Sequence, residues 1–185
     1  MNDAGALDGL SFSIDPDTGL RQAYEPNVAI DTLLEFPGNP KSHDLGAIIA
    51  SLERNGMADA IKVQLSTRRI IGGHGTLKAL RHLKRTVVPV LWIDCDDRTA
   101  RRLLLAYNRA GELGGFEVGA LADFLTEQAE SGDLNGTGYD GDDVDAIRSS
   151  IVTPNFLPGT QEGQGKLDQR QPIECPHCHQ TFTPA

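Results

Sequence analysis

The segment from Ile70 to Leu80 (IIGGHGTLKAL) constrains the fold more than any other part of the chain. A short apolar run typical of a β-strand ends in Gly72 and Gly73 and passes directly into a helical pattern. This arrangement points backbone N–H groups and the positive end of a helix into one small hollow, which suits an anion such as a phosphate. Glycines at 72, 73 and 75 allow positive φ and close approach of a ligand. A strand-to-helix turn that binds nothing stays open as the alternative, because short glycine motifs are weak evidence.

Hydrophobic periodicity predicts a mixture of strands and helices around this motif. Strands are expected at 28–30, 61–65, 69–71 and 87–93, and helices after Ser42, after the glycine loop and at 98–110, 118–129 and 141–150. Pro89 favours a position near a sheet edge or a bulge for its strand. Ser42 is expected to cap the first helix, Asp96 or Asp97 another and Asp140 the last. The last two helices are expected to bury Leu121, Phe124, Leu125, Val144, Ile147 and Ile151.

Length and composition favour one compact α/β (mixed α+β) domain with appendages. The chain has 185 residues, of which 39% are hydrophobic and 23% charged. No apolar run reaches the roughly 20 residues of a membrane helix, and no secretory signal is recognisable at the N-terminus. Three cysteines without a disulfide framework favour a reducing cytoplasm. The expected parts are a loose leader (1–23), a core domain (24–112), an acidic helical extension (113–152), a linker (153–172) and a tail (173–185).

The charges are unevenly distributed along the chain. Although the net charge is -9, residues 62–85 contain seven Lys or Arg and no acid, whereas residues 112–145 contain ten acids and no Lys or Arg. The net charge argues against a protein that coats nucleic acid indiscriminately. The basic sector 62–85 nevertheless predicts a site for a polyanion such as DNA, and two solvated faces of opposite sign are the alternative interpretation.

Six short motifs follow one another in a characteristic order between Asp31 and Ile151. They are Asp31–Lys41, Ser51–Gly56, Ile70–Thr76 with Ala79, Val88–Val90, Leu105–Arg109 and Thr137–Asp140. Together they resemble the ParB/sulfiredoxin superfamily, and in particular the ParB-like nuclease domain proteins of phages and mobile elements. The resemblance implies a ParB/sulfiredoxin-like N-terminal domain with a small helical extension and a flexible tail.

The resemblance also implies a nucleotide site. In ParB proteins the ligand is CTP with a divalent metal, so a nucleoside triphosphate with Mg²⁺, CTP or ATP, is the implied ligand here. Its phosphates would be held by Gly72, Gly73, His74, Gly75 and Thr76, opposite Asn108 and Arg109, with Asn39 and Lys41 in a third wall. His74 is the candidate general acid or base, and a loop histidine that only hydrogen-bonds the backbone is the alternative. For Asn108 and Arg109, simple helix capping and solvation is the alternative.

The chain departs from the family pattern at two of these positions. Thr76 stands where the family often has a phosphate-binding arginine, and Tyr107 replaces the acid that often precedes the asparagine. The glycine loop also lacks the cysteine that sulfiredoxin chemistry requires, which argues against that reaction.

Three functions fit these features. The first is a nucleotide-binding protein of ParB-like type that acts in DNA transactions, with slow hydrolysis at most and with a homodimer as a further expectation. The second is a metal-dependent nuclease, for which His74 and His82 are the histidines near the basic sector. The third is a phosphotransferase that resembles free serine kinases, which would need a carboxylate beside the loop.

The tail carries a separate motif. Cys175 and Cys178 have the spacing of a zinc knuckle, and His179 is an adjacent candidate ligand. Half of a zinc ribbon completed by another subunit, a tail without metal, and a CxxC redox motif are the three interpretations that the sequence leaves open.

Overall fold

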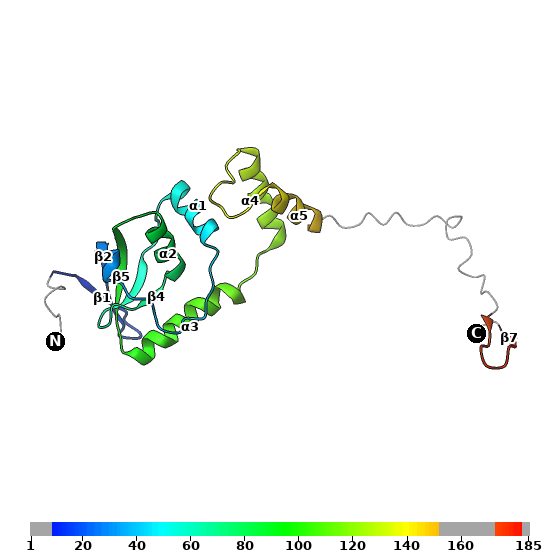
Figure 1. Ribbon diagram of the computed structural model, residues 1–185, viewed down its shortest axis with the longest axis horizontal. Helices are drawn as coiled ribbons and strands as arrows, with labels where there is room; N and C mark the ends of the chain where they lie inside the picture. Colours follow the sequence, from blue (N-terminus) through cyan, green and yellow to red (C-terminus); the bar gives the residue numbers. More distant parts are fainter. Residues whose placement is uncertain (1–8, 152–172, 183–185) are drawn as a thin grey trace. The chain divides into compact units, whose positions relative to one another are not determined.

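The computed structural model describes residues 9–151 and 173–182, and the chain divides into two compact units, residues 1–151 and 152–185. The first unit contains one five-stranded sheet (Figure 1). Its strands lie in the order β1 (Phe12–Ile14), β2 (Arg21–Ala29), β5 (Val87–Asp94), β3 (Ile61–Gln64) and β4 (Ile70–Gly72). The pair β3–β5 is parallel and the other pairs are antiparallel.

Three helices pack against the sheet, and two more come after them in the chain. They are α1 (Leu45–Asn55), α2 (His74–His82), α3 (Asp97–Leu113), α4 (Val118–Glu130) and α5 (Gly141–Ile151), with a short 3₁₀ turn at Ile30–Thr32. Helices α1 and α2 cover one face of the sheet, and α3 runs along the other (Figure 1). The fold is therefore the expected mixed α+β arrangement.

Alternation along the strands explains why both faces are covered. Ile70 and Trp92 belong to the core that includes Leu77 and Leu80 of α2. Their sequence neighbours Ile71 and Ile93 point the opposite way, into the core beneath α3. Strands that are apolar on both faces require a layer of helix on each side. Helix α2 begins just after the edge strand β4, and Gly73 before it lies close to Ile61 of β3.

Strand β5 lies in the centre of the sheet, although it contains Pro89. The neighbouring strand β2 has a register shift between Glu25 and Val28, opposite Pro89. Pairing with β3 begins only at Val90. Because proline donates no backbone hydrogen bond, the bulge accommodates it in a central strand. The bulge predicted from Pro89 is confirmed, and the edge position is wrong.

The loose leader expected over residues 1–23 is wrong for the segments that form β1 and the start of β2. The two strands are joined by a turn in which the Asp15 carboxylate accepts hydrogen bonds from the backbone and the hydroxyl of Thr18. The strands are short and mostly exposed, so their periodicity is weak in the sequence. The Arg21 guanidinium stacks 4.7 Å from the centre of the Phe12 ring.

Helix boundaries follow the predictions closely, with differences at one cap and two core positions. The N-cap of α1 is Asp44 rather than Ser42, since the Asp44 carboxylate accepts from the Ala47 amide at 3.0 Å. Phe124 is 69% exposed and Ile151 44% exposed, which corrects their assignment to the core. Helices α4 and α5 instead pack through the smaller surface that contains Ala122, Leu125 and Val144.

The contact between α1 and α2 depends on the missing side chain of Gly75. A Cβ atom at Gly75 would lie 2.7 Å from both the His43 ring and the end of Ile48. We expect Gly75→Val to lower the free energy of unfolding by about 1–3 kcal/mol through overpacking, measured by urea denaturation. Gly111 in α3 is the control, because nothing lies within 4 Å of its added Cβ. Gly111→Ala should raise stability by about 0.5–1 kcal/mol, and equal losses in both variants would contradict the assigned packing.

In the second unit, the described residues form a β-hairpin of β6 (Ile173–Glu174) and β7 (Thr181–Phe182). The linker expected over 153–172 lies outside the described residues. Within the described ranges, no helix is long and apolar enough to cross a membrane.

Candidate nucleotide site

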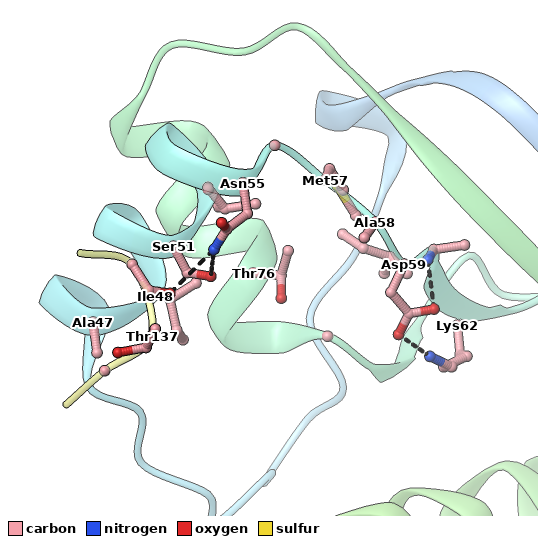
Figure 2. Close-up of a pocket in the computed structure, with 17 residues that line it drawn as sticks. Ala47, Ile48, Ser51, Asn55, Met57, Ala58, Asp59, Lys62, Thr76 and Thr137 are labelled. Atoms are coloured by element: carbon pink, nitrogen blue, oxygen red, sulfur yellow. Dashed lines mark hydrogen bonds and ion pairs between the residues drawn. The ribbon is translucent and has the colours of Figure 1, made fainter. Parts of the chain in front are cut away.

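A cavity of about 560 Å³ lies beside the N-terminus of α2. Its walls come from α1, the 56–62 segment that leads into β3, the start of α2 and the 136–138 turn. Figure 2 shows Thr76 projecting from α2 into the space between the α1 side chains and the segment Met57–Asp59. Segments that are distant in sequence therefore meet at the N-terminus of α2, directly after the glycine motif.

The N-terminus of α2 differs from those of the other helices that the structure describes. Carboxylates cap them: Asp44, Asp96, Glu117 and Asp140 accept hydrogen bonds from first-turn amides of α1, α3, α4 and α5. Helix α2 begins after Gly73, which has φ of 96° and offers no side-chain cap. Gly73 and Thr76 line the cavity, so the positive end of α2 lies at the cavity wall without a side-chain cap.

Polar side chains line the opposite walls of the cavity. The Asn55 side-chain nitrogen lies 3.2 Å from the Ser51 hydroxyl and donates to the Gly136 carbonyl at 3.1 Å. The Lys62 ammonium contacts the Asp59 carboxylate at 2.6 Å (Figure 2). This hydrogen bond from Lys62 is the main reason that the pKa of Asp59 lies below its ordinary value. The cavity thus offers amide, hydroxyl and charged groups around an apolar floor that includes Ile48 and Met57.

The predicted glycine loop divides into residues with different roles. Gly73 and Thr76 line the cavity. A Cβ at Gly72 would meet Lys62 at 3.2 Å and Tyr107 of α3 at 3.6 Å, so Gly72 lets β4 lie close between β3 and α3. Gly75 is buried against α1 and serves helix packing.

His74 is buried, with 4% of its surface exposed, and its Nε2 atom accepts a hydrogen bond from the Phe36 amide at 3.3 Å. Burial lowers the pKa of His74 to about 4, since desolvation penalises the charged ring and outweighs the opposing effect of Glu35. A neutral ring bound to backbone matches the alternative stated for this residue. The role of His74 as a general acid or base stays a prediction.

Lys41, Asn108 and Arg109 line a second hollow of about 290 Å³ rather than the first. The side-chain nitrogen of Asn108 donates to the side-chain oxygen of Asn39 at 3.0 Å, so the segment with Asn39 and Lys41 does lie beside Asn108. The Glu112 carboxylate forms ion pairs with the Lys41 ammonium at 2.7 Å and with the Arg109 guanidinium at 3.3 Å. Two cations from different segments therefore converge on one negative group, and both hold the pKa of Glu112 below its ordinary value, Lys41 more strongly.

The comparisons with known proteins bear on this arrangement. The sequence matches no protein-family model and no curated protein. The structure is similar to the crystal structure of the C-terminally truncated chromosome-partitioning protein ParB from Caulobacter crescentus complexed with CTP-gamma-S. The TM-score is 0.55 at 18% identity, over 74% of this chain and 81% of that one. The chain has a ParB-like fold.

Two further ParB structures show weaker similarity. A Pnob8-like ParB-N domain has a TM-score of 0.45 at 19% identity, and a pNOB8-like ParB N-domain has 0.43 at 17%. They match 62% and 63% of this chain, which spans 50% and 49% of their lengths, respectively.

Sequence reasoning missed several residues that line the larger cavity of this ParB-like unit. The sequence motifs place Ser51 and Asn55 only in a helix and its end, and Thr137 only in a turn, yet all three line the cavity. The available signal was Asn55-Gly56 at the predicted helix end, because binding residues are often found in the segments that connect helices and strands.

The basic sector of the ParB-like unit is partly neutralised. Lys62 pairs with Asp59, while Lys78 and Arg81 lie 3.6 and 3.7 Å from Glu35. Arg68 lies over the Trp92 ring, 5.5 Å from its centre. Lys84 and Arg85 are exposed beyond the C-terminus of α2.

The tail hairpin holds Cys175, Cys178 and His179. The His179 Nδ1 atom lies 2.8 Å from the Glu174 carboxylate. In residues 9–151 and 173–182, no group of three or more His, Cys, Asp or Glu side chains is arranged to hold a metal ion.

Proposed function

We propose that this protein binds a nucleoside triphosphate, CTP or ATP, and acts with it in DNA transactions. The observation that carries the proposal is the cavity of about 560 Å³ that opens onto the uncapped N-terminus of α2. Its volume lies within the range of about 300–1,000 Å³ typical of small-molecule sites. The ParB-like fold adds support, because one similar structure was obtained with CTP-gamma-S.

In this proposal the nucleoside occupies the cavity and the phosphates leave it across the start of α2. The amides that follow Gly73 and the Thr76 hydroxyl donate to phosphate oxygens. Asn55 and Ser51 face the nucleoside, where amide and hydroxyl groups distinguish bases by hydrogen bonding. Mg²⁺ is bound in proteins by one or two carboxylates together with phosphate oxygens and water. Asp59 is a carboxylate at the cavity wall that fits this role.

Lys41 and Arg109 complete the phosphate site in this proposal. Both contact the Glu112 carboxylate. A triphosphate carries more charge than a carboxylate and accepts the planar guanidinium in a bidentate manner. The terminal phosphates would therefore displace Glu112 from the two cations.

DNA contact is assigned to the exposed end of the basic sector, around Arg81, Lys84 and Arg85. Binding there would rest on phosphate contacts, so it would weaken as salt is raised.

A calorimetric screen of CTP, ATP and GTP with Mg²⁺ tests the proposal. We expect one nucleotide to bind, and Arg109→Ala to weaken it about tenfold or more through loss of a charge-assisted hydrogen bond. Arg101→Ala is the matched control, because Arg101 is exposed on the same helix and lines neither hollow. Glu112→Gln should tighten binding about three- to tenfold by removing the competing carboxylate. Failure of all three nucleotides to bind, or equal affinities in the two arginine variants, would contradict the site.

A further inference from the structure

The C-terminal hairpin closes a tight turn around two cysteines. The Cys175 amide donates to the Gln180 carbonyl, and the His179 amide donates to the Cys175 carbonyl, both at 2.9 Å. These two bonds close a turn around Cys175-Pro176-His177-Cys178. Residue 179 completes the turn with φ of 58°, a conformation that favours glycine.

Cys175 and Cys178 both lie in this turn, with two residues between them. A cysteine binds zinc as the thiolate. Cys178 is exposed and Cys175 is partly exposed, so the pair is accessible to a metal ion.

One hairpin supplies two ligands, whereas a structural zinc site takes four in a tetrahedron. The His179 ring contacts Glu174 rather than the thiols. Residues 152–172 and 183–185 contain no cysteine or histidine in the sequence. Cys95, the remaining cysteine, stands at the end of β5 in the other unit and is partly buried. A second copy of the same hairpin supplies two further thiolates of the same geometry.

We propose that Cys175 and Cys178 of two chains bind one Zn²⁺ between them, and that this shared ion joins the chains through their C-terminal hairpins. Each thiol releases a proton to solvent when it binds the metal. His179 takes part as the turn residue with positive φ and not as a ligand. The site is independent of the nucleotide site, because none of its residues belongs to the ParB-like unit.

The test is a zinc titration of the full-length protein under reducing conditions, with competition by a chelating dye. We expect half an equivalent of zinc per chain, and a sedimentation coefficient that rises from monomer to dimer with the same dependence on zinc. The Cys175→Ser/Cys178→Ser double variant should lose high-affinity zinc and zinc-dependent association together. Cys95→Ser is the matched control and should retain both.

Two readouts separate this site from its alternatives. Cobalt in place of zinc should show the charge-transfer intensity of four thiolates per ion. His179→Gly should retain or tighten zinc binding, since glycine adopts positive φ without strain, whereas a ligand role would abolish it. One equivalent of zinc per chain, loss of binding in His179→Gly, or zinc binding that survives the double cysteine variant would overturn the proposal.

Discussion

Acidification from about pH 7 to about pH 4.5 should destabilise the wild-type protein by about 2–3 kcal/mol more than a His74→Gln variant. In the folded protein, burial lowers the pKa of His74 from the ordinary 6.5 to about 4. The unfolded chain therefore binds more protons than the folded chain between these values. Stability from this group is present above about pH 6.5 and is lost as the pH falls towards 4.

Glutamine is the informative replacement because its side-chain oxygen can accept the Phe36 amide in place of Nε2. Urea denaturation of both proteins at several pH values gives the difference directly. Subtracting the variant curve removes contributions from carboxylates and from His43, whose pKa is lowered by burial and by Lys78. Parallel curves for the two proteins would mean that His74 titrates normally and that the buried assignment is incorrect.

Gly73→Val should weaken nucleotide binding by about a hundredfold or more, the largest effect that we expect on the proposed function. A Cβ at this position would lie 3.3 Å from the Ile61 side chain, and φ of 96° disfavours any branched residue. The valine would also occupy the cavity wall where the phosphates cross the start of α2. Calorimetry with the nucleotide identified in the screen measures the loss.

A loss of binding in Gly73→Val could come from backbone strain or from a side chain that blocks the site, and a second variant distinguishes the two causes. Gly73→Asn provides this separation, because asparagine tolerates positive φ better than other residues while still adding a side chain at the cavity. Gly132→Asn is the matched control, with φ of 74° and nothing within 4 Å of an added Cβ. We expect Gly73→Asn to fold and to bind nucleotide poorly, and Gly132→Asn to bind normally. Normal binding by Gly73→Asn would place the phosphates elsewhere.

Much of the fold could be predicted from the sequence because its signals are local. The apolar run at 87–93 and the glycines after Ile71 have few interpretations other than a buried strand and a strand-to-helix turn. Strand β1 escaped prediction, since a three-residue exposed strand has almost no periodicity of its own. The position of β5 could not follow from Pro89 alone, because the bulge that tolerates it lies in β2, more than sixty residues away in sequence.

The candidate site was predictable only in part, because its walls come from four segments. Gly73 and Thr76 were recognisable from the motif, whereas the contributions of Asn55 and Thr137 depend on how α1 and the 136–138 turn pack. The environment of His74 also depends on a distant segment, because its Nε2 atom accepts a hydrogen bond from the Phe36 amide. Histidine in a glycine loop is compatible with both catalysis and core packing until that partner is placed.

In the proposed site, the first-turn amides of α2 hold the phosphates of a nucleotide, and its nucleoside fills the adjacent cavity. The most direct test follows the backbone amide resonances of isotope-labelled protein during titration with the Mg²⁺ complexes of CTP and ATP. We predict that the largest saturable shifts fall on residues 73–76, accompanied by shifts in 55–62. Shifts confined to the exposed basic residues 81–85, or none at saturating nucleotide, would contradict the account.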